Sequence, residues 1–329
     1  MDRLRVAVVG LGKMGLLHAS ILNVMPSVEV VALCDKSYLL LKFVRKLFKK
    51  AKAVDEVDKL ADLDLDFVYI ATPIPAHFPV VKAIYLKEVT HNLFVEKTLA
   101  SSWEKAEELC DLAQTFGGVN MVGYMKRFSP TFGKAKSLLD RRDLGDLNYF
   151  DAHAYSSDFS FQKGSKMSRS RGGVLGDLGS HIIDLALWFF GDLEVESTLN
   201  SILDETGEDS INFKVKKMGL EGTVHVSWCM DNYRMPSFGL IIIGSAGTMK
   251  VDDYSLDLKL SNGISYRWFR HDLNDHVSFL LGESEYYRED ETFVNSLLKG
   301  GKVEPSFVTA SKVDRVIDQV KDKMKAYGN

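Results

Sequence analysis

Short apolar segments alternate with segments of helical period through the first third of the chain. Apolar runs at 4–9, 28–34, 66–71, 93–95 and 119–122 predict buried strands, and residues 14–24, 38–50, 76–87 and 101–116 predict helices. Strands separated by helices of this length form βαβ units, which give a parallel sheet covered on both faces. We therefore expect a doubly wound α/β domain at the N-terminus.

One of these helices, 38–50, has two interpretations. Its apolar positions Leu40, Leu41, Val44, Leu47 and Phe48 fall on one face, and its lysines suggest either a solvated face or a helix lying on a membrane. A packed helix with a solvated basic face is the commoner arrangement, and we adopt it.

The pattern changes after about Gly123. Turn signals such as Asn262-Gly263 separate longer strand-like stretches, which predict a mostly antiparallel open sheet. These stretches are 147–156, 194–203, 210–215, 222–228, 238–243, 248–252, 256–260 and 265–269, with helices at 130–139, 182–190, 286–298 and 311–327. We predict two domains, 1–123 and an α+β domain at 124–329, in line with roughly 100–200 residues per domain.

Composition narrows the class of partner. The formal net charge is −4 over 329 residues, so no broad basic field attracts nucleic acid or an anionic membrane, and we expect a small-molecule partner. Cys34, Cys110 and Cys229 are widely separated and form no metal-ligand spacing, so we expect reduced thiols and no structural metal. The sequence shows neither a signal-peptide core nor a membrane-spanning run, which favours the cytoplasm.

The turn after the first strand, Gly10-Leu11-Gly12-Lys13-Met14-Gly15, has the GxGxxG spacing and opens a helix. Gly10 permits the tight turn, Gly12 lets a pyrophosphate approach the backbone, and Gly15 allows close helix–strand packing. Asp35 ends the second strand, where a carboxylate accepts hydrogen bonds from an adenosine ribose and repels a 2′-phosphate. This favours NAD, although Lys36 and Ser37 leave NADP open. The alternative is an α/β protein that uses these glycines only for packing.

A second constellation lies in the segment Gly172–Asp184, GGVLGDLGSHIID. If the chain is helical from Asp177, then Asp177, His181 and Asp184 share one face of an otherwise apolar helix, together with Trp188. A histidine beside a carboxylate suits proton transfer near neutral pH. Two other interpretations stay open: a buried His–Asp pair without chemistry, and a metal site formed by the three side chains.

Taken together, the motifs resemble those of the glucose–fructose oxidoreductase/inositol dehydrogenase (Gfo/Idh/MocA) family. The resemblance covers essentially the whole chain and rests on the order of several short segments. These are the GLGKMG turn, Ala71–His77 (ATPIPAH), Glu96-Lys97-Thr98, Gly123–Phe128 (GYMKRF), the Gly172–Asp184 segment, Gly244–Thr248 (GSAGT) and the helix with Glu285, Tyr286, Tyr287 and Phe293.

The resemblance implies an N-terminal Rossmann domain and a C-terminal α/β domain whose open sheet often forms the subunit interface, hence a homodimer or homotetramer. It implies NAD(P)-linked oxidation of a secondary hydroxyl of a sugar, sugar acid, nucleotide sugar or polyol. By position, Lys97 would touch the substrate hydroxyl and the nicotinamide ribose, His181 would be the general base with Asp177 beside it, and Thr72, Pro73, His77 and Glu96 would line the dinucleotide. Thr98 replaces the motif's usual proline.

Substrate contacts are less readable. Candidates are Tyr124, Arg127, Tyr155, Arg169 and Tyr233, with Arg171 and Arg234 as further arginines able to hold a carboxylate or phosphate. Two other functions stay open. A ligand-sensing regulator of the same fold needs no proton acceptor, and reduction of an imine or enal needs no His181 base.

Overall fold

The computed structural model describes residues 3–157, 172–204, 207–273 and 284–327, and its contacts group them into two compact units. The first unit comprises Met1–Tyr124 and Tyr286–Asp314, and the second comprises Met125–Glu285 and Arg315–Asn329. Residues 286–314 therefore return to the first unit, whereas the continuous division at 123/124 assigned them to the second. Helical periodicity predicts that a helix exists but carries no information on which sheet it packs against.

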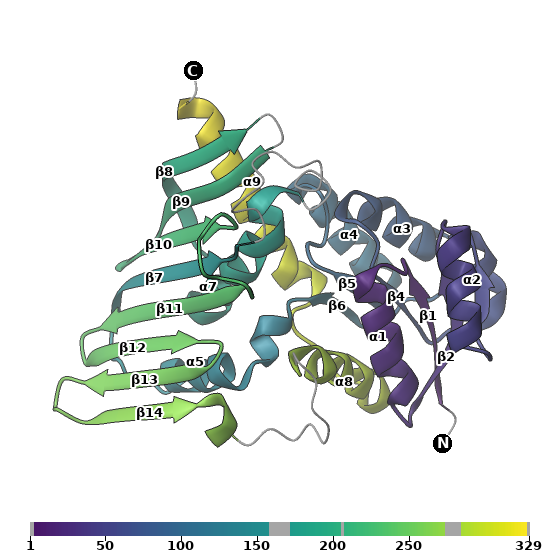
Figure 1. Ribbon diagram of the computed structural model, residues 1–329, viewed down its shortest axis with the longest axis horizontal. Helices are drawn as coiled ribbons and strands as arrows, with labels where there is room; N and C mark the ends of the chain where they lie inside the picture. The colour runs from purple at the N-terminus through teal and green to yellow at the C-terminus, as the bar shows by residue number, and fades with distance from the viewer. Residues whose placement is uncertain (1–2, 158–171, 205–206, 274–283, 328–329) are drawn as a thin grey trace. The chain divides into compact units, whose positions relative to one another are not determined.

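The first unit is built on a six-stranded sheet in the order β3-β2-β1-β4-β5-β6, with every pair parallel (Figure 1). The strands are β1 (Leu4–Val9), β2 (Val28–Cys34), β3 (Lys52–Val54), β4 (Phe67–Ile70), β5 (Leu93–Glu96) and β6 (Asn120–Gly123). The connecting elements are α1 (Lys13–Val24), α2 (Tyr38–Leu47), η1 (Val57–Leu63), α3 (Ile74–Leu86) and α4 (Trp103–Phe116), and α8 (Glu285–Lys299) comes later. The predicted parallel sheet is confirmed; β3 and η1 were not predicted because they are short and partly polar.

In the described part of the second unit, the strands form an eight-stranded sheet in the order β14-β13-β12-β11-β7-β10-β9-β8, in which only β7 and β10 pair in parallel. The strands are β7 (Leu147–Tyr155), β8 (Glu194–Asp204), β9 (Gly207–Lys217), β10 (Leu220–Ser227), β11 (Ser237–Gly244), β12 (Gly247–Asp252), β13 (Ser255–Leu260) and β14 (Ser265–Phe269). Its other elements are η2 (Met125–Phe128), α5 (Pro130–Asp140), η3 (Leu175–Gly179), α7 (Ser180–Phe190) and η4 (Arg270–Asp272), and α9 (Phe307–Tyr327) belongs to the first unit up to Asp314 and to the second from Arg315. The predicted mostly antiparallel sheet is confirmed.

Burial alternates along β7 and so separates the two faces of this sheet. Phe150, Ala152 and Ala154 are fully buried, and the Phe150 ring stacks at 4.3 Å on Phe190 of α7. The intervening side chains, Asp151 and His153 among them, are only partly buried. Alternate residues of a strand point to opposite faces, so α7 covers the inner face and leaves the other face more open.

Helix α2 departs from the interpretation of 38–50 as a packed amphipathic helix. Only Leu41 and Val44 are buried, whereas Leu47, assigned to the packed face, is 60% exposed. The reason lies in the sheet order: α2 packs on β2 and on the short edge strand β3, which support a narrow stripe of the helix.

The thiols and helices add two observations. Cys34, Cys110 and Cys229 are all free. Burial, reinforced by the neighbouring Asp35, raises the pKa of the Cys34 thiol to about 12, so this thiol stays protonated near neutral pH. Across the described ranges, no helix combines the length and apolar character needed to cross a bilayer.

Candidate functional site

The glycine turn joins β1 to α1, and its three glycines have different surroundings. Gly10 has φ +87°, and a Cβ there would lie 2.7 Å from the backbone of Ala71. A Cβ on Gly15 would lie 1.8 Å from the Gly10 carbonyl oxygen, whereas one on Gly12 would meet nothing within 4 Å. Gly10 and Gly15 are thus required by packing, and Gly12 faces open space at the start of α1, where Lys13 and Met14 begin the helix.

This open space fits a dinucleotide. Gly12 caps α1 without a side-chain hydrogen bond, so the helix N-terminus can present its N–H groups to a phosphate. A pocket of about 620 Å³ adjoins Gly10 and is lined by Asp35, Thr72 and Pro73. The Thr72 Oγ1 atom is buried and has no hydrogen-bond partner among the residues described, so it can bond to a group bound in this pocket.

Asp35 is fixed by the backbone on both sides. Its Oδ2 accepts a hydrogen bond from the Leu11 N–H at 2.7 Å, and its Oδ1 accepts one from the Ser37 N–H at 2.7 Å. Three more acidic residues, Asp55, Glu56 and Asp58, line the same pocket, whereas Lys36 is the one basic residue in its described lining. A pocket wall with four carboxylates disfavours a second phosphate on the ribose.

Glu96 ends β5 and Lys97 follows it. The Glu96 side chain is buried, and its Oε2 accepts a hydrogen bond from the Lys97 N–H at 3.1 Å. The Lys97–Thr98 peptide is cis, at the position where the family motif has proline, and Thr98 Oγ1 donates to the Ala100 carbonyl at 2.8 Å. The lysine backbone is thus held by its own neighbours at the carboxyl end of a central strand.

His18, which the sequence analysis did not single out, connects this segment to two helices. Its Nε2 lies 2.8 Å from Glu96 Oε1, and its Nδ1 lies 2.8 Å from Asp290 Oδ1 of α8. His18 and Asp290 are fully buried, among the rings of Tyr69, Phe94 and Tyr286. Its place in the sequence, three residues after Gly15 in an apolar helix, is the signal that was available.

The charge state of this network follows from its geometry. Burial alone would lower the pKa of His18, but Asp290 and Glu96 raise it well above the ordinary value of 6.5. Burial alone would raise the pKa of Glu96, but the contacts with His18 and Lys97 lower it. His18, Glu289 and Asp290 also place possible metal ligands within 4.8 Å of one another. Because both ring nitrogens already contact carboxylates, a proton rather than a metal ion satisfies the imidazole.

His77, predicted to line the dinucleotide, faces inward. Its ring is fully buried, with Nε2 2.7 Å from the Thr72 carbonyl oxygen and Nδ1 2.7 Å from the Thr98 carbonyl oxygen. Burial lowers its pKa, so the neutral ring donates to one of these two carbonyls at a time. His77 therefore joins the segment containing Thr72 to the segment after Lys97, and its ring does not line the pocket.

In the second unit, His181 lies in the first turn of α7. Its side chain is buried, and its ring meets the Phe238 ring edge-on at 5.6 Å. Residues Leu175–Gly179 form a π-helical turn, so Asp177 does not continue the α-helical spacing that the sequence analysis assumed. Gly172 and Gly173 have φ of +82° and +75°, and single π turns are frequent at functional sites. The interrupted helix re-aims Asp177 relative to His181.

Asp184 and Arg127 form a buried ion pair rather than two independent site residues. The Asp184 carboxylate accepts hydrogen bonds from Arg127 Nε at 2.8 Å and Nη2 at 2.6 Å, and the guanidinium lies 5.6 Å from the Trp188 ring. The carboxylate that Arg127 holds thus belongs to α7 itself. This pairing supports neither the metal-site interpretation of Asp177, His181 and Asp184 nor a substrate-binding role for Arg127.

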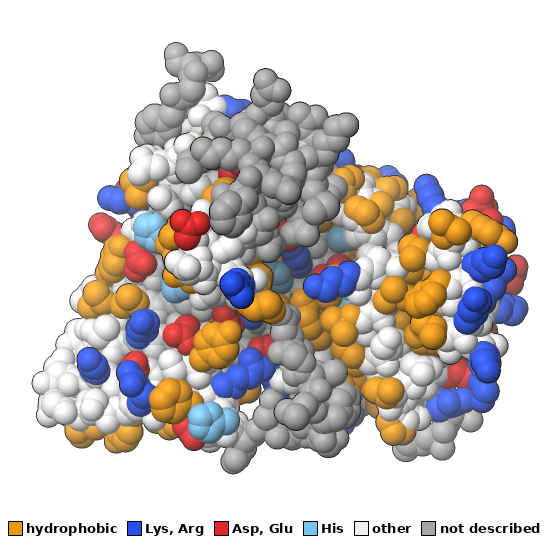
Figure 2. All heavy atoms as spheres, in the orientation of Figure 1, with side chains coloured by type: hydrophobic (Ala, Val, Ile, Leu, Met, Phe, Trp, Pro, Cys, Tyr) orange, Lys and Arg blue, Asp and Glu red, His pale blue; other side chains and the backbone are white. Residues whose placement is uncertain are grey.

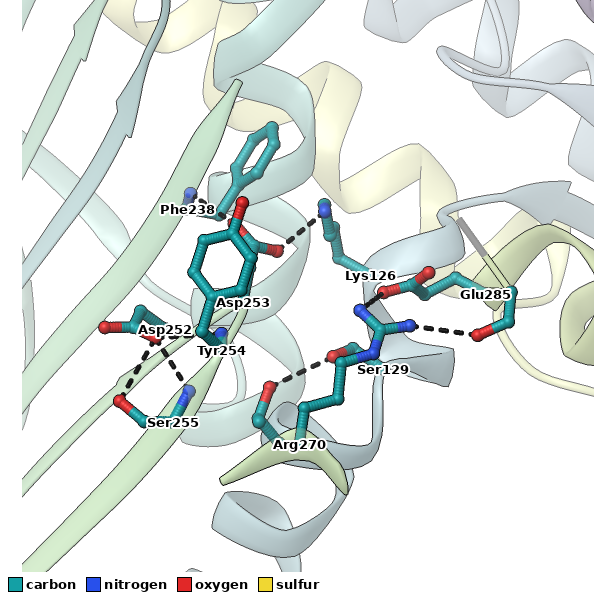
Figure 3. Close-up of polar contacts among 11 residues, drawn as sticks. Lys126, Ser129, Phe238, Asp252, Asp253, Tyr254, Ser255, Arg270 and Glu285 are labelled. Carbon is teal, nitrogen blue, oxygen red and sulfur yellow. Dashed lines mark hydrogen bonds and ion pairs between the residues drawn. The ribbon is translucent and has the colours of Figure 1, made fainter. Parts of the chain in front are cut away.

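A second buried cation, Lys126, lies over the ring of Phe238 (Figure 3). Lys126 Nζ is 2.7 Å from Asp253 Oδ1 and 4.8 Å from the centroid of the Phe238 ring, and Asp253 Oδ2 accepts the Phe238 N–H at 2.9 Å. Arg270 pairs with Glu285 at 2.7 Å in the same view. Asp253 and Lys126 thus fix both the backbone and the ring that supports His181.

Of the remaining predicted substrate contacts, Tyr155 and Tyr233 contact each other in the second unit. Tyr155 lies on the more open face of β7, the same face as His153. Its ring stacks on the His153 ring at 4.8 Å and meets the Tyr233 ring edge-on at 5.4 Å. Tyr124 is fully buried at the end of the first unit's sheet. Arg169 and Arg171 lie outside the described residues, and Arg234 is exposed. Substrate roles for Tyr124, Tyr155, Tyr233 and Arg169 remain predictions from sequence.

Comparison with known proteins gives the family. Residues 4–124 match the model of the GFO/IDH/MocA oxidoreductase family with an NAD-binding Rossmann fold, and residues 132–250 match the GFO/IDH/MocA C-terminal domain. The chain belongs to this family of oxidoreductases, its first unit is the NAD-binding domain, and its cofactor is NAD.

Similar proteins include inositol dehydrogenases. A scyllo-inositol 2-dehydrogenase (NAD(+)) of Bacillus subtilis is 28% identical over 194 residues, which cover 57% of this chain and 54% of that enzyme. An inositol 2-dehydrogenase of Rhizobium meliloti is 22% identical over 92% of this chain and 91% of its own. A levoglucosan dehydrogenase solved with NADH superposes with a TM-score of 0.89 at 17% identity, over 99% of this chain and 98% of that one. At this identity, the superposition shows a shared fold.

Proposed function

We propose that this protein is an NAD-dependent dehydrogenase that oxidises a secondary hydroxyl of a sugar, sugar acid, nucleotide sugar or polyol. The observation that carries the proposal is that His18 of α1, the helix that follows the glycine turn, contacts the Glu96-Lys97 segment within one unit. The sugar and polyol dehydrogenases among the relatives supply the substrate class.

We assign catalytic roles to three residues of this chain, Lys97, His181 and Asp177. We assign to Lys97 a hydrogen bond to the reacting hydroxyl oxygen, because an ammonium stabilises the developing alkoxide. We assign to His181 the removal of the hydroxyl proton, with Asp177 orienting or supporting it. When bound, the dinucleotide supplies a hydride acceptor. The buried surroundings of His181, including the Phe238 ring, restrict water around the imidazole.

The open sheet face of the second unit supports a homo-oligomer. Ile241 and Ile243 of β11 are 40% and 39% exposed, and a face of this kind is covered by pairing with a second copy. We propose a dimer or tetramer through this sheet in the cytoplasm. Light scattering of the chain with Ile241→Lys tests the assembly: a shift to monomer supports it, and an unchanged mass contradicts it.

Substrate turnover and NAD binding can be measured separately, and each tests a different part of the proposed function. With a panel of polyols and sugars plus NAD, we expect NADH absorbance at 340 nm to rise for at least one substrate of this class. His181→Ala is expected to lower kcat by about 10²–10⁴-fold while NAD binding, followed by titration, stays unchanged. Binding of NAD without turnover of any panel member would instead favour a sensing protein.

A further inference from the structure

Helix α2 carries an apolar stripe on its solvent side. Leu39, Phe43 and Leu47 follow one another at four-residue spacing and are 75%, 50% and 60% exposed, and Tyr38 beside them is 69% exposed. The opposite side of the same helix buries Leu41 and Val44 against β2 and β3. Residues four apart lie one above another on a helix, so the exposed side chains form a continuous strip. Single exposed apolar residues are ordinary on a protein surface, but an aligned strip of this kind marks an interaction surface.

Basic residues surround this strip, and acidic residues are absent from its sequence. Residues 38–50 contain Lys42, Arg45, Lys46, Lys49 and Lys50, all exposed, and neither aspartate nor glutamate. Figure 2 shows hydrophobic and basic side chains gathered over the region where Figure 1 places α2. The helix dipole favours cations only in the last turn, where Arg45 and Lys46 lie. It does not explain the presence of Lys42, Lys49 and Lys50. The concentration contrasts with a net charge of −4 for the whole chain.

A hollow of about 280 Å³ lies at the C-terminal end of this helix. Its lining includes Leu47, Phe48, Lys49 and Lys50, together with Arg3 and Glu29. Arg3 is held to Glu29 by an ion pair of 3.3 Å, and Lys49 and Lys50 are exposed beside it. Two lysines beside an apolar wall provide a setting for a phosphate group whose attached chain is hydrophobic.

We propose that α2 with residues 48–50, called here the α2 surface, binds the surface of an anionic membrane. Leu39, Phe43 and Leu47 enter the interface between headgroups and acyl chains, while the lysines lie at the level of the lipid phosphates. This differs from the expectation, drawn from the total charge, that a membrane is not a partner. Total charge does not report a local segment such as 38–50, whose five charged side chains are all basic.

The same observations argue against the other occupants. A second copy of the chain placed on the α2 surface by two-fold symmetry would bring basic residues against basic residues, which costs binding free energy. Leu39 and Phe43 lie on the exposed side of the helix and Leu47 borders the hollow at its C-terminal end, whereas a peptide helix docks along a continuous groove. A flat, negatively charged layer that admits apolar side chains matches both the shape and the charge.

The test is sedimentation of the full chain with vesicles of phosphatidylcholine alone or mixed with phosphatidylglycerol. We expect binding to the anionic vesicles only, and release at high salt. Since each basic residue near such a surface contributes about 1 kcal/mol, each removed charge lowers the partition coefficient about fivefold. The variant K42Q/K46Q/K49Q is therefore expected to bind about 100-fold less well, and L39S/F43S/L47S is expected to lose binding as well.

Matched controls separate the α2 surface from general effects. K250Q/K259Q removes two exposed lysines from β12 and β13, and L86S removes an exposed leucine from the end of α3, so all three substitutions should leave vesicle binding unchanged. Equal binding to neutral and anionic vesicles, or unchanged binding of both α2 variants, overturns the proposal. A larger assembly without lipid that F43S dissociates would assign the surface to a second copy and also overturns it. Dehydrogenase activity plays no part in these readouts, so the proposal stands or falls independently of the proposed function.

Discussion

The His18 imidazole lies between two carboxylates, with its Nε2 2.8 Å from Glu96 Oε1 and its Nδ1 2.8 Å from Asp290. This contact connects α1, the helix that follows the glycine turn, to Glu96, whose carboxylate accepts the backbone N–H of Lys97. A buried cation between two anions is stable only while all three groups keep their charges. We therefore expect His18 to position the backbone of Lys97 through Glu96.

Replacing His18 with Gln should lower both stability and turnover. The substitution leaves Glu96 and Asp290 buried without the shared cation, and we expect a loss of about 3 kcal/mol in the free energy of unfolding, measured with urea. Because the Lys97 backbone loses its support, kcat should fall more than KM rises. A variant that is destabilised but retains the wild-type kcat would show that His18 has a structural role only.

We also expect the charge of His18 to make the stability of the protein depend on pH. The pKa of His18 is raised in the folded protein, so the stabilising contribution is fully present below the unfolded value of 6.5 and is lost as pH rises through the folded value. Urea titrations from pH 6 upward should show wild-type stability falling towards that of H18Q. Asp290→Asn keeps an acceptor for Nδ1 without the charge, so it should move this loss to lower pH. Parallel curves for wild type and H18Q would contradict the assignment. The titratable side chains that face the ring are Glu96, Glu289, Asp290 and Tyr69.

Two glycine substitutions should separate binding from folding. Gly12→Ala places its Cβ in open space, so the fold should be kept while NADH binding, followed by fluorescence titration, weakens at least about tenfold. Gly15→Ala drives its Cβ to 1.8 Å from the Gly10 carbonyl oxygen, so it should lower the melting temperature. If Gly12→Ala bound NADH as tightly as wild type, the phosphates would not lie against this turn.

We expect the Arg127–Asp184 pair to contribute to the stability of the fold rather than to substrate binding. Arg127→Met removes the guanidinium that pairs with the fully buried Asp184 carboxylate, at a cost of about 3–5 kcal/mol in unfolding free energy. The double variant R127M/D184L removes both charges and should recover much of this loss, measured by urea unfolding. A double variant as unstable as R127M would indicate that the pair does more than satisfy its own charges.

Asp35 should govern the choice between NAD and NADP. Asp35→Ser removes the carboxylate at the end of β2, and we expect the preference for NAD over NADP to fall about tenfold, or ~1.4 kcal/mol. Asp58→Asn is the matched control, because Asp58 lines the same pocket and pairs with Lys87 away from the β2 terminus. An equal effect of both substitutions would mean that only the total charge of the pocket matters.

The local pattern of the chain determined most of the architecture. Buried strands alternating with helices predicted the parallel sheet, the glycine spacing predicted a tight turn between β1 and α1, and the turn signals predicted the antiparallel sheet. These features depend on residues within a few positions of one another, which is the range over which hydrophobic period and backbone preference act. The segment before His181 was found in the same way, although its π turn was not.

Tertiary structure alone decided which charges meet. His18 and Asp290 are 272 residues apart, Lys126 and Asp253 are 127 apart, and no local pattern predicts that either pair shares a buried site. The exposed strip of α2 was likewise decided by the position of β3 at the sheet edge, which buries one side of the helix and leaves Leu39, Phe43 and Leu47 to solvent. The local sequence pattern indicates which side chains share a face of a helix or strand. Which residues contact that face depends on the path of the whole chain.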